Sequence, residues 1–436
     1  MRRWILVLAV SAAAAGAAVL YQTAARQRAY KTLLERGDAA LNENKTFAAM
    51  EAYSGAIAFR PDSMLAYLRR GQTYHRRADS GDLELAARDF RTAAALDPAS
   101  TRPLEELGDV LYQLGQFDRA ADAFERSLRL DDRSARVTLK LAFARYHDGN
   151  VGSAIATVSQ VLKLDDKLAD AHYLRALCLR DRARRADALA ALEKAVALAP
   201  ASIPIREELA DLYGSLDRRA DELVQLQLLA GLDRTHVERQ IAVGLAHARS
   251  HRWELAILTL TNALERASDD PAVYGALGRV WLDASRARDD ATGLAKAREA
   301  LERAASSPSA TSEILTLYGR ALSAEGDEAG AERALQQASE RYPIDPDALL
   351  LYANASERRN HLVAAREALI GYGALVTAES DMVARVGRIA AISLRLHEPD
   401  VALTWLKRAQ STNPGDARLV AALADAERAR DTPRAR

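Results

Sequence analysis

The stretch TRPLEELGDVLYQLGQFDRAADAFERSLRLDDRS, residues 101–134, predicts two short helices joined by a tight turn. Pro103 lies near the start of an apolar pattern with three- and four-residue spacing, and Gly115 follows the end of that pattern. A second apolar stripe follows at once, on Ala120, Phe124, Ser127 and Leu128. Neither helix can bury its stripe alone, so we expect the two to pack antiparallel. Gly108 leaves a notch in the first helix, and we expect the small side chain of Ala120 to fit into it.

The same pattern recurs along the chain in units of about 34 residues, and it resembles the tetratricopeptide repeat family. The residues that carry the resemblance here are Gly108, Tyr112, Gly115, Ala120 and Phe124. The resemblance implies an all-α, right-handed superhelical solenoid whose task is to bind other proteins. Eleven units can be placed, beginning at Tyr30, Met64, Thr101, Ala135, Ala169, Ile203, Val237, Pro271, Ser312, Pro346 and Val383.

These units suggest four parts of the chain. We expect an N-terminal segment over residues 1–29, repeats one to five over 30–202, repeats six to eleven over 203–416, and a capping helix with a tail over 417–436. The sixth unit departs most from the pattern, because Glu222 stands where a small residue is expected. A hinge between two subdomains is therefore expected near this unit. The final helix, from Ala417 to about Arg430, would cover the last exposed face of the array.

Composition excludes several classes of protein. The chain has 436 residues, of which 49% are hydrophobic, and its 60 basic residues balance 60 acidic ones. Without a net positive charge, nucleic acid is not an expected partner. The one cysteine, Cys178, can form no intramolecular disulfide, and we expect it to be a small buried residue. The scarcity of lysine beside arginine is consistent with a GC-rich bacterial genome.

The N-terminus carries a long uncharged run from Trp4 to Ala25, preceded by Arg2 and Arg3. At about 1.5 Å per helical residue, such a run can span a bilayer. An uncleaved signal anchor is the favoured interpretation. The alternatives are an export signal cleaved at an Ala-x-Ala site and, less favoured, a buried soluble helix. No cysteine follows the run, so lipoprotein processing is excluded.

The charges on either side of this anchor give conflicting indications of its orientation. Arg2 and Arg3 favour a cytoplasmic N-terminus, whereas Arg26, Arg28 and Lys31 lie just beyond the other end. We expect a single pass of the bacterial inner membrane with the repeats in the periplasm. If the signal is cleaved, the repeats would instead be secreted or periplasmic.

Catalysis is not expected, because the repeats use almost the whole chain. No Gly-x-Gly-x-x-Gly, phosphate loop, Gly-x-Ser-x-Gly or His-Glu-x-x-His motif occurs. His247 and His251 have the four-residue spacing that can place two imidazoles on one metal, but no acid or cysteine motif completes a site. We therefore predict no catalytic residue, no metal, no cofactor and no small-molecule substrate.

A partner is expected on the first helices of the repeats. Positions two, five, nine, twelve and thirteen of each first helix share one face, which should line the concave side of the solenoid. In repeats three to five this face and its surroundings contain Asp109, Tyr112, Arg136, Lys140, Phe143, Tyr146, Tyr173 and Arg180. Aromatic rings and arginines are typical of binding hot spots. The alternative is that Tyr112 and Tyr146 only pack on the next repeat.

One known use of this face in the family, a carboxylate clamp for chaperone tails, is not expected here. Position five of repeats one to five holds Leu34, Leu68, Glu105, Leu139 and Tyr173 rather than lysine. The leading hypothesis is a non-catalytic, membrane-anchored scaffold that binds a peptide or helix of partner proteins in an envelope assembly, secretion or polymer-export machine. The alternative is a regulatory accessory subunit of a separately encoded enzyme or transporter. An enzyme that uses the groove itself is the least favoured class.

Overall fold

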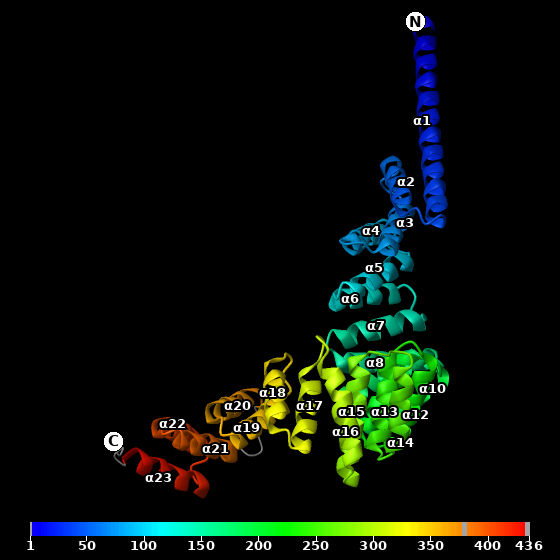
Figure 1. The fold of residues 1–436 in the computed structure, drawn as a ribbon. Coiled ribbons are helices and arrows are strands. Elements are labelled where there is room, and N and C mark those ends of the chain that lie inside the picture. Colours follow the sequence, from blue (N-terminus) through cyan, green and yellow to red (C-terminus); the bar gives the residue numbers. More distant parts are fainter. Residues whose placement is uncertain (1, 377–381, 432–436) are drawn as a thin grey trace. The chain divides into compact units, whose positions relative to one another are not determined.

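A computed structural model describes the backbone of residues 2–376 and 382–431, and side chains from Leu20 onward. In this part of the chain every regular element is an α-helix, and there are 23 of them (Figure 1). The helices are α1 Arg2–Asn42, α2 Thr46–Phe59, α3 Met64–Arg77, α4 Asp82–Leu96, α5 Thr101–Gln113, α6 Phe117–Leu128, α7 Ala135–His147, α8 Val151–Leu164, α9 Ala169–Asp181, α10 Arg185–Leu198, α11 Ile203–Ser215, α12 Arg219–Leu232, α13 Val237–Arg249, α14 Trp253–Leu264, α15 Pro271–Arg288, α16 Ala291–Ala305, α17 Ser312–Glu325, α18 Glu328–Glu340, α19 Pro346–Arg358, α20 Leu362–Leu375, α21 Met382–Arg395, α22 Pro399–Thr412 and α23 Ala417–Asp431.

Consecutive helices pair as helix-turn-helix units, which confirms the all-α repeat fold. Each odd-numbered helix from α3 to α19 begins at the residue expected from the sequence, and α21 begins one residue earlier than expected. Local signals fix several of these starts and ends: the Ser134 hydroxyl accepts a hydrogen bond from the backbone of Val137 at the start of α7. Gly115, with φ of 70°, lies in the turn between α5 and α6.

The notch at Gly108 is filled by Phe124 rather than by Ala120, which corrects the packing expected from the sequence. A Cβ atom added to Gly108 would lie 2.4 Å from the Phe124 ring. Ala120 is also buried, but it lies one helical turn before Phe124 on α6. A ring needs a flat surface without a Cβ, so glycine is required beneath it.

The same contact recurs in other repeats, between a glycine of the first helix and a large side chain of the second. The pairs are Gly37 with Tyr53, Gly71 with Phe90, Gly244 with Leu260, Gly278 with Leu301, and Gly319 with Leu335. Other repeats have a buried alanine at the glycine position and a buried aliphatic residue opposite: Ala142 and Val158, Ala176 and Leu192, Ala353 and Leu369, Ala390 and Leu406. Every repeat named here therefore combines a small residue with a large one.

The chain divides into two compact units, Met1–Leu212 and Tyr213–Arg436. The expected division after residue 202 stays a prediction. In the second unit, Glu222 of α12 lies against Gly214 and forms an ion pair with Arg249 of α13. A carboxylate is thus accommodated at a position that small residues take elsewhere, because the residue facing it has no side chain.

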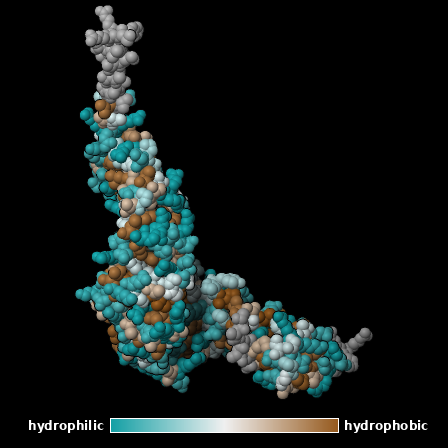
Figure 2. All heavy atoms as spheres, turned by 180° about the vertical axis from the view of Figure 1, so that it is seen from behind, coloured by the Kyte–Doolittle hydropathy of each residue, from teal (hydrophilic) through white to brown (hydrophobic). Residues whose placement is uncertain are grey.

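The N-terminal helix α1 runs without a break from Arg2 into the first helix of repeat one. Its last part is held by Tyr30, which is buried and shares a hydrogen bond of 2.6 Å with Ser63. Among the residues with described side chains, we find no helix long and apolar enough to cross a membrane. The predicted span, Trp4–Ala25, lies mostly outside those residues. Over the face in Figure 2, hydrophobic residues form scattered patches between hydrophilic ones.

We predict that Gly108→Ala destabilises the chain by about 1 to 3 kcal/mol, because its new methyl group would overlap the Phe124 ring. Urea unfolding followed by circular dichroism would show a lower midpoint. Gly387→Ala is the matched control, since a Cβ atom at this helical glycine would meet no atom within 4 Å. The control should be neutral or stabilise by up to about 1 kcal/mol, because alanine favours the helix.

A double variant sharpens this test. Gly108→Ala combined with Phe124→Leu reproduces the alanine and leucine pair of repeats five and ten, so it should regain part of the lost stability. Equal unfolding midpoints for Gly108→Ala and Gly387→Ala would contradict the packing described here.

Candidate protein-binding face

The first helices of neighbouring repeats touch one another in the first unit: α5 contacts α7, and α7 contacts α9. We call the surface that α5, α7 and α9 form together the first-helix face. All eight residues selected from the sequence lie on these three helices. Within one helix, residues three or four positions apart lie on the same side, as Arg136 and Lys140 do on α7.

Two of the basic residues selected from the sequence, Arg136 and Lys140, are paired with acidic residues. Lys140 Nζ lies 2.5 Å from the Asp109 carboxylate, across from α7 to α5. One turn earlier, Arg136 donates to Glu105. The Arg136 side chain remains 65% exposed, so this pair lies at the surface. These contacts join repeat three to repeat four.

Arg180 makes the corresponding link at the other end of the face. Its guanidinium lies 2.5 Å from Glu208 of α11 and 3.0 Å from Asp181 of α9. The Arg180 side chain is 42% exposed. Arg136, Lys140 and Arg180 are therefore neutralised locally while part of each side chain stays open to solvent.

The aromatic residues of the face are half-buried rather than open. Tyr112 meets Phe117 edge to face, with 5.2 Å between ring centroids, and meets His147 in the same way at 5.6 Å. Phe143 and Tyr146 pack against a buried cluster that includes Leu174 and Cys178. These rings contribute to the contact between repeats, as the alternative interpretation of Tyr112 and Tyr146 expected.

The surroundings of Tyr146 and Tyr173 raise the pKa of both phenols. The Tyr146 hydroxyl donates a hydrogen bond of 2.8 Å to Asp181 in the next repeat. Burial, together with this bond to a carboxylate, raises the pKa of Tyr146 to about 12. Burial and the charge of Glu208 raise the pKa of Tyr173. Both phenols therefore stay protonated at physiological pH and can act as hydrogen-bond donors.

The sequence analysis did not identify the acidic partners of Arg136, Lys140 and Tyr146, although their spacing in the sequence indicates them. Arg136 and Glu105 are 31 residues apart, Lys140 and Asp109 are also 31 apart, and Tyr146 and Asp181 are 35 apart. These separations are close to one repeat length. The second unit contains ion pairs with a similar spacing in sequence: Arg279 with Glu313, Arg288 with Glu254, Arg388 with Glu357, and Arg358 with Glu328.

The two histidines considered for metal binding lie in different surroundings. His247 is buried, and burial followed by the charge of Arg252 lowers its pKa. His251 lies in the following turn, where its ring meets Trp253 edge to face at 5.4 Å. No group of three or more histidine, cysteine or acidic side chains that could hold a metal occurs among the described residues.

A sequence profile of the tetratricopeptide repeat family matches residues 75–135, 105–168, 139–203 and 319–370. The first three matches overlap, so the pattern is continuous from residue 75 to 203 and returns in the second unit. These segments of the chain therefore match the tetratricopeptide repeat family. No curated protein matches it.

Several solved structures are similar over part of the chain. A tetratricopeptide repeat protein from Parabacteroides merdae is 15% identical, with a TM-score of 0.45, and the match covers 58% of this chain and 99% of the other. PilF of Pseudomonas aeruginosa is 17% identical, with a TM-score of 0.41 and coverage of 50% and 97%. MamA of Desulfovibrio magneticus is 22% identical, with a TM-score of 0.34 and coverage of 39% and 92%.

Cys178 of α9 is buried, and its reactivity tests whether this part of the first unit is closed to solvent. Burial raises its pKa to about 11, so the reactive thiolate is rare at pH 8. We predict that Ellman's reagent modifies the native chain at least roughly a hundredfold more slowly than the urea-unfolded chain. Because the sequence contains one cysteine, the signal reports this site alone. Equal rates in the two states would show that Cys178 is not buried.

Proposed function

We propose that this tetratricopeptide repeat chain is a non-catalytic scaffold that holds a peptide or helix of a partner protein on its first-helix face. The observation that carries the proposal is the combination of half-buried aromatic rings and partly exposed arginines on α5, α7 and α9. Such side chains offer large contact areas and directed hydrogen bonds, which are typical of binding hot spots.

The pairing of the charges supports a binding role as well as a structural one. Arg136 and Arg180 are held by Glu105 and Glu208, so they lose little conformational freedom when a partner arrives. Each remains partly exposed and keeps donors for an acidic or carbonyl group. A preorganised surface of this kind suits an extended peptide or an amphipathic helix.

We further propose that residues Trp4–Ala25 anchor the scaffold in the bacterial inner membrane, with the repeats in the periplasm. Two observations support this: the run carries no charge, and α1 continues from it into repeat one without a turn. The first repeat would then be held a few residues from the membrane surface. A place in an envelope assembly, secretion or polymer-export machine fits such a position.

Charge reversal separates binding from folding on the first-helix face. We predict that Arg136→Glu abolishes capture of the partner from membrane extracts. The change removes the guanidinium donors that face the partner and places a second negative charge beside Glu105. The thermal stability should change by no more than about 1 kcal/mol, as for most surface ion pairs. Quantitative pull-down and circular dichroism would measure the two effects.

The matched control is Arg126→Glu on the second helix α6. Arg126 is also a partly exposed arginine, 3.9 Å from Asp122, but it lies outside the first-helix face. This variant should retain capture. Equal capture by both variants, or loss of capture only where folding is also lost, would contradict a binding role for the first-helix face.

Membrane anchoring has a separate test. We predict that Val10→Arg shifts the chain from the membrane fraction towards the soluble fraction, because an arginine at the centre of a span costs about 2.5 to 3.5 kcal/mol. Gln27→Arg, just beyond the span, should remain in the membrane. Protease added to spheroplasts should digest the repeats, and full protection would show the opposite orientation. A mature N-terminus mapped near Ala18 would instead indicate cleavage.

A further inference from the structure

One side of α12, the second helix of repeat six, is exposed and apolar. From the second residue of this helix to its last, the exposed residues are Ala220, Val224, Gln227, Leu228, Gly231 and Leu232. At 100° per residue these positions share one side of the helix, about 140° wide. Val224 is 49% exposed, Leu228 43% and Leu232 46%. Three large aliphatic side chains are therefore open to solvent along one helix.

A second helix of another repeat shows how the same positions look when they face only water. In repeat three, Asp122 and Arg126 lie on α6 at the positions that correspond to Val224 and Leu228, three repeat lengths earlier. These two residues form a surface ion pair of 3.9 Å. Solvation alone thus favours charged residues at these positions, and the aliphatic pair of α12 needs another explanation.

The charged residues of α12 are confined to its first turn, where each has a partner in the same chain. Arg219 Nε lies 2.7 Å from the Asp217 carboxylate, and Glu222 forms an ion pair with Arg249. From Leu223 to Leu232 the sequence of α12 contains no charged residue. A surface that covered this part of the helix would therefore bury no unpaired charge, which is the main cost of covering a helix side.

Gly231 lies on the same side of α12 without a reason inside the chain. Its backbone is helical, so no left-handed turn requires glycine here. A Cβ atom at this position would meet no atom within 4 Å. Glycine destabilises a helix relative to alanine. At Gly108 the corresponding notch holds the Phe124 ring, whereas the notch at Gly231 is empty.

We propose that this side of α12 binds α12 of a second copy of the chain, antiparallel about a two-fold axis between residues 227 and 228. Val224 and Gly231 are equally far from this axis, one on each side of it. Val224 of each copy therefore faces Gly231 of the other, and both notches are filled. Each contact joins a small residue to a large one, as the contacts inside the repeats do.

The arrangement of this surface selects a second copy over another occupant. The large residue and the notch that receives it lie on one helix at symmetric positions, so the surface is complementary to itself. At the axis Gln227 meets Gln227 of the second copy, where two amides can exchange hydrogen bonds. Leu228 meets its own equivalent, and its burial favours association. The proposal does not depend on partner binding by the first-helix face.

Cross-linking of the full-length chain in detergent tests the register. Gln227→Cys places a thiol beside the axis, so oxidation with copper phenanthroline should give a disulfide-linked dimer. Ala220→Cys is the matched control, because two copies of this residue would lie about 22 Å apart along the helix axes. A disulfide needs Cα atoms within about 7 Å, so we expect at least about fivefold less dimer from the control. The parent, whose Cys178 is buried, sets the background.

A charge placed in the contact tests its contribution to affinity. Val224→Glu should weaken self-association, measured by sedimentation of the chain in detergent, by at least about tenfold, because each copy would bury a carboxylate. Val363→Glu is the matched control. Val363 is also 49% exposed and lies on another second helix, α20. This variant should leave the dissociation constant unchanged within about twofold.

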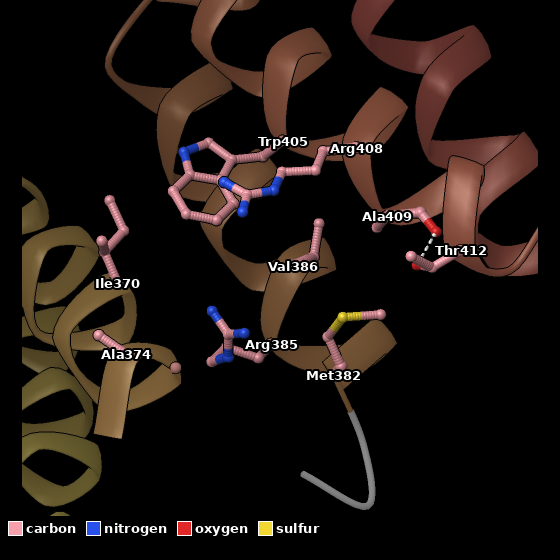
Figure 3. Close-up of a pocket in the computed structure, with 10 residues that line it drawn as sticks. Ile370, Ala374, Met382, Arg385, Val386, Trp405, Arg408, Ala409 and Thr412 are labelled. Carbon is pink, nitrogen blue, oxygen red and sulfur yellow. Dashed lines mark hydrogen bonds between the residues drawn. The ribbon is translucent and has the colours of Figure 1, made fainter. Parts of the chain in front are cut away.

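The control position also lies outside a cavity that α20 borders. This cavity of about 420 Å³ lies beside Trp405, where α20, α21 and α22 meet (Figure 3). Arg385 of α21 lines it, and a Cβ atom added to Gly373 of α20 would overlap the Arg385 guanidinium. Val363 lies seven residues before Ile370, the first residue of α20 that lines the cavity. Val363→Glu thus changes an open surface position.

An exchange of two residues separates a second copy from any other partner. Gly231→Val alone fills the notch and Val224→Gly alone leaves it empty, so each should weaken self-association by at least about fivefold. The variant with both changes again places valine opposite glycine in each copy, and it should recover most of the affinity. Circular dichroism melts verify the fold of all variants, which the open space at Gly231 should preserve.

Several results would overturn the proposal. One is a folded parent chain that stays monomeric at concentrations up to about 100 μM. Equal dimer yields from Gln227→Cys and Ala220→Cys, or equal effects of Val224→Glu and Val363→Glu, would place the association elsewhere, such as in the N-terminal segment. A monomeric parent that captures another protein only while Val224 is intact would assign this surface to that protein instead.

Discussion

The contact between a small residue on the first helix and a large side chain on the second is the constraint on which each repeat depends. At Gly108 the ring of Phe124 lies where a Cβ atom would be, and Gly37 and Gly71 hold Tyr53 and Phe90 in the same way. Fully burying such a ring contributes about 1.5 to 3 kcal/mol. The contact also sets how closely the two helices approach, and therefore where their remaining side chains point.

Contacts between repeats form a second level of organisation. Apolar clusters such as the one around Phe90, Leu107, Phe124 and Leu141 extend from one repeat into the next. Ion pairs such as Lys140 with Asp109 join first helices across the same boundary. Partly exposed pairs of this kind contribute only about 0 to 1 kcal/mol each. Their larger effect is to orient the side chains of the first-helix face, and this orientation links the stability of the array to its proposed binding role.

The candidate binding residues show how far sequence reasoning could go. Helical periodicity could group Arg136, Lys140 and Tyr146 along one first helix, α7, because the positions of residues within one helix follow from geometry alone. Periodicity could not show that Glu105, Asp109 and Asp181 already engage them. Those partners lie in the adjacent repeat, so the contact depends on how two repeats stack and on the rotamers of both side chains. The face is consequently more rigid and less open than a list of exposed arginines and aromatics suggests.

The sequence by itself determined the helix pairs and their starting residues, since these depend on local signals such as Pro103, Gly115 and the recurring apolar stripe. It could not decide that Phe124 rather than Ala120 fills the notch at Gly108, because both lie on the same face of α6 and only the crossing of the two helices selects one. The tertiary structure also decided the cavity beside Trp405. That space arises where three helices meet, and its chemistry depends on Arg385 lying over Gly373, two residues on different helices that no periodic pattern connects.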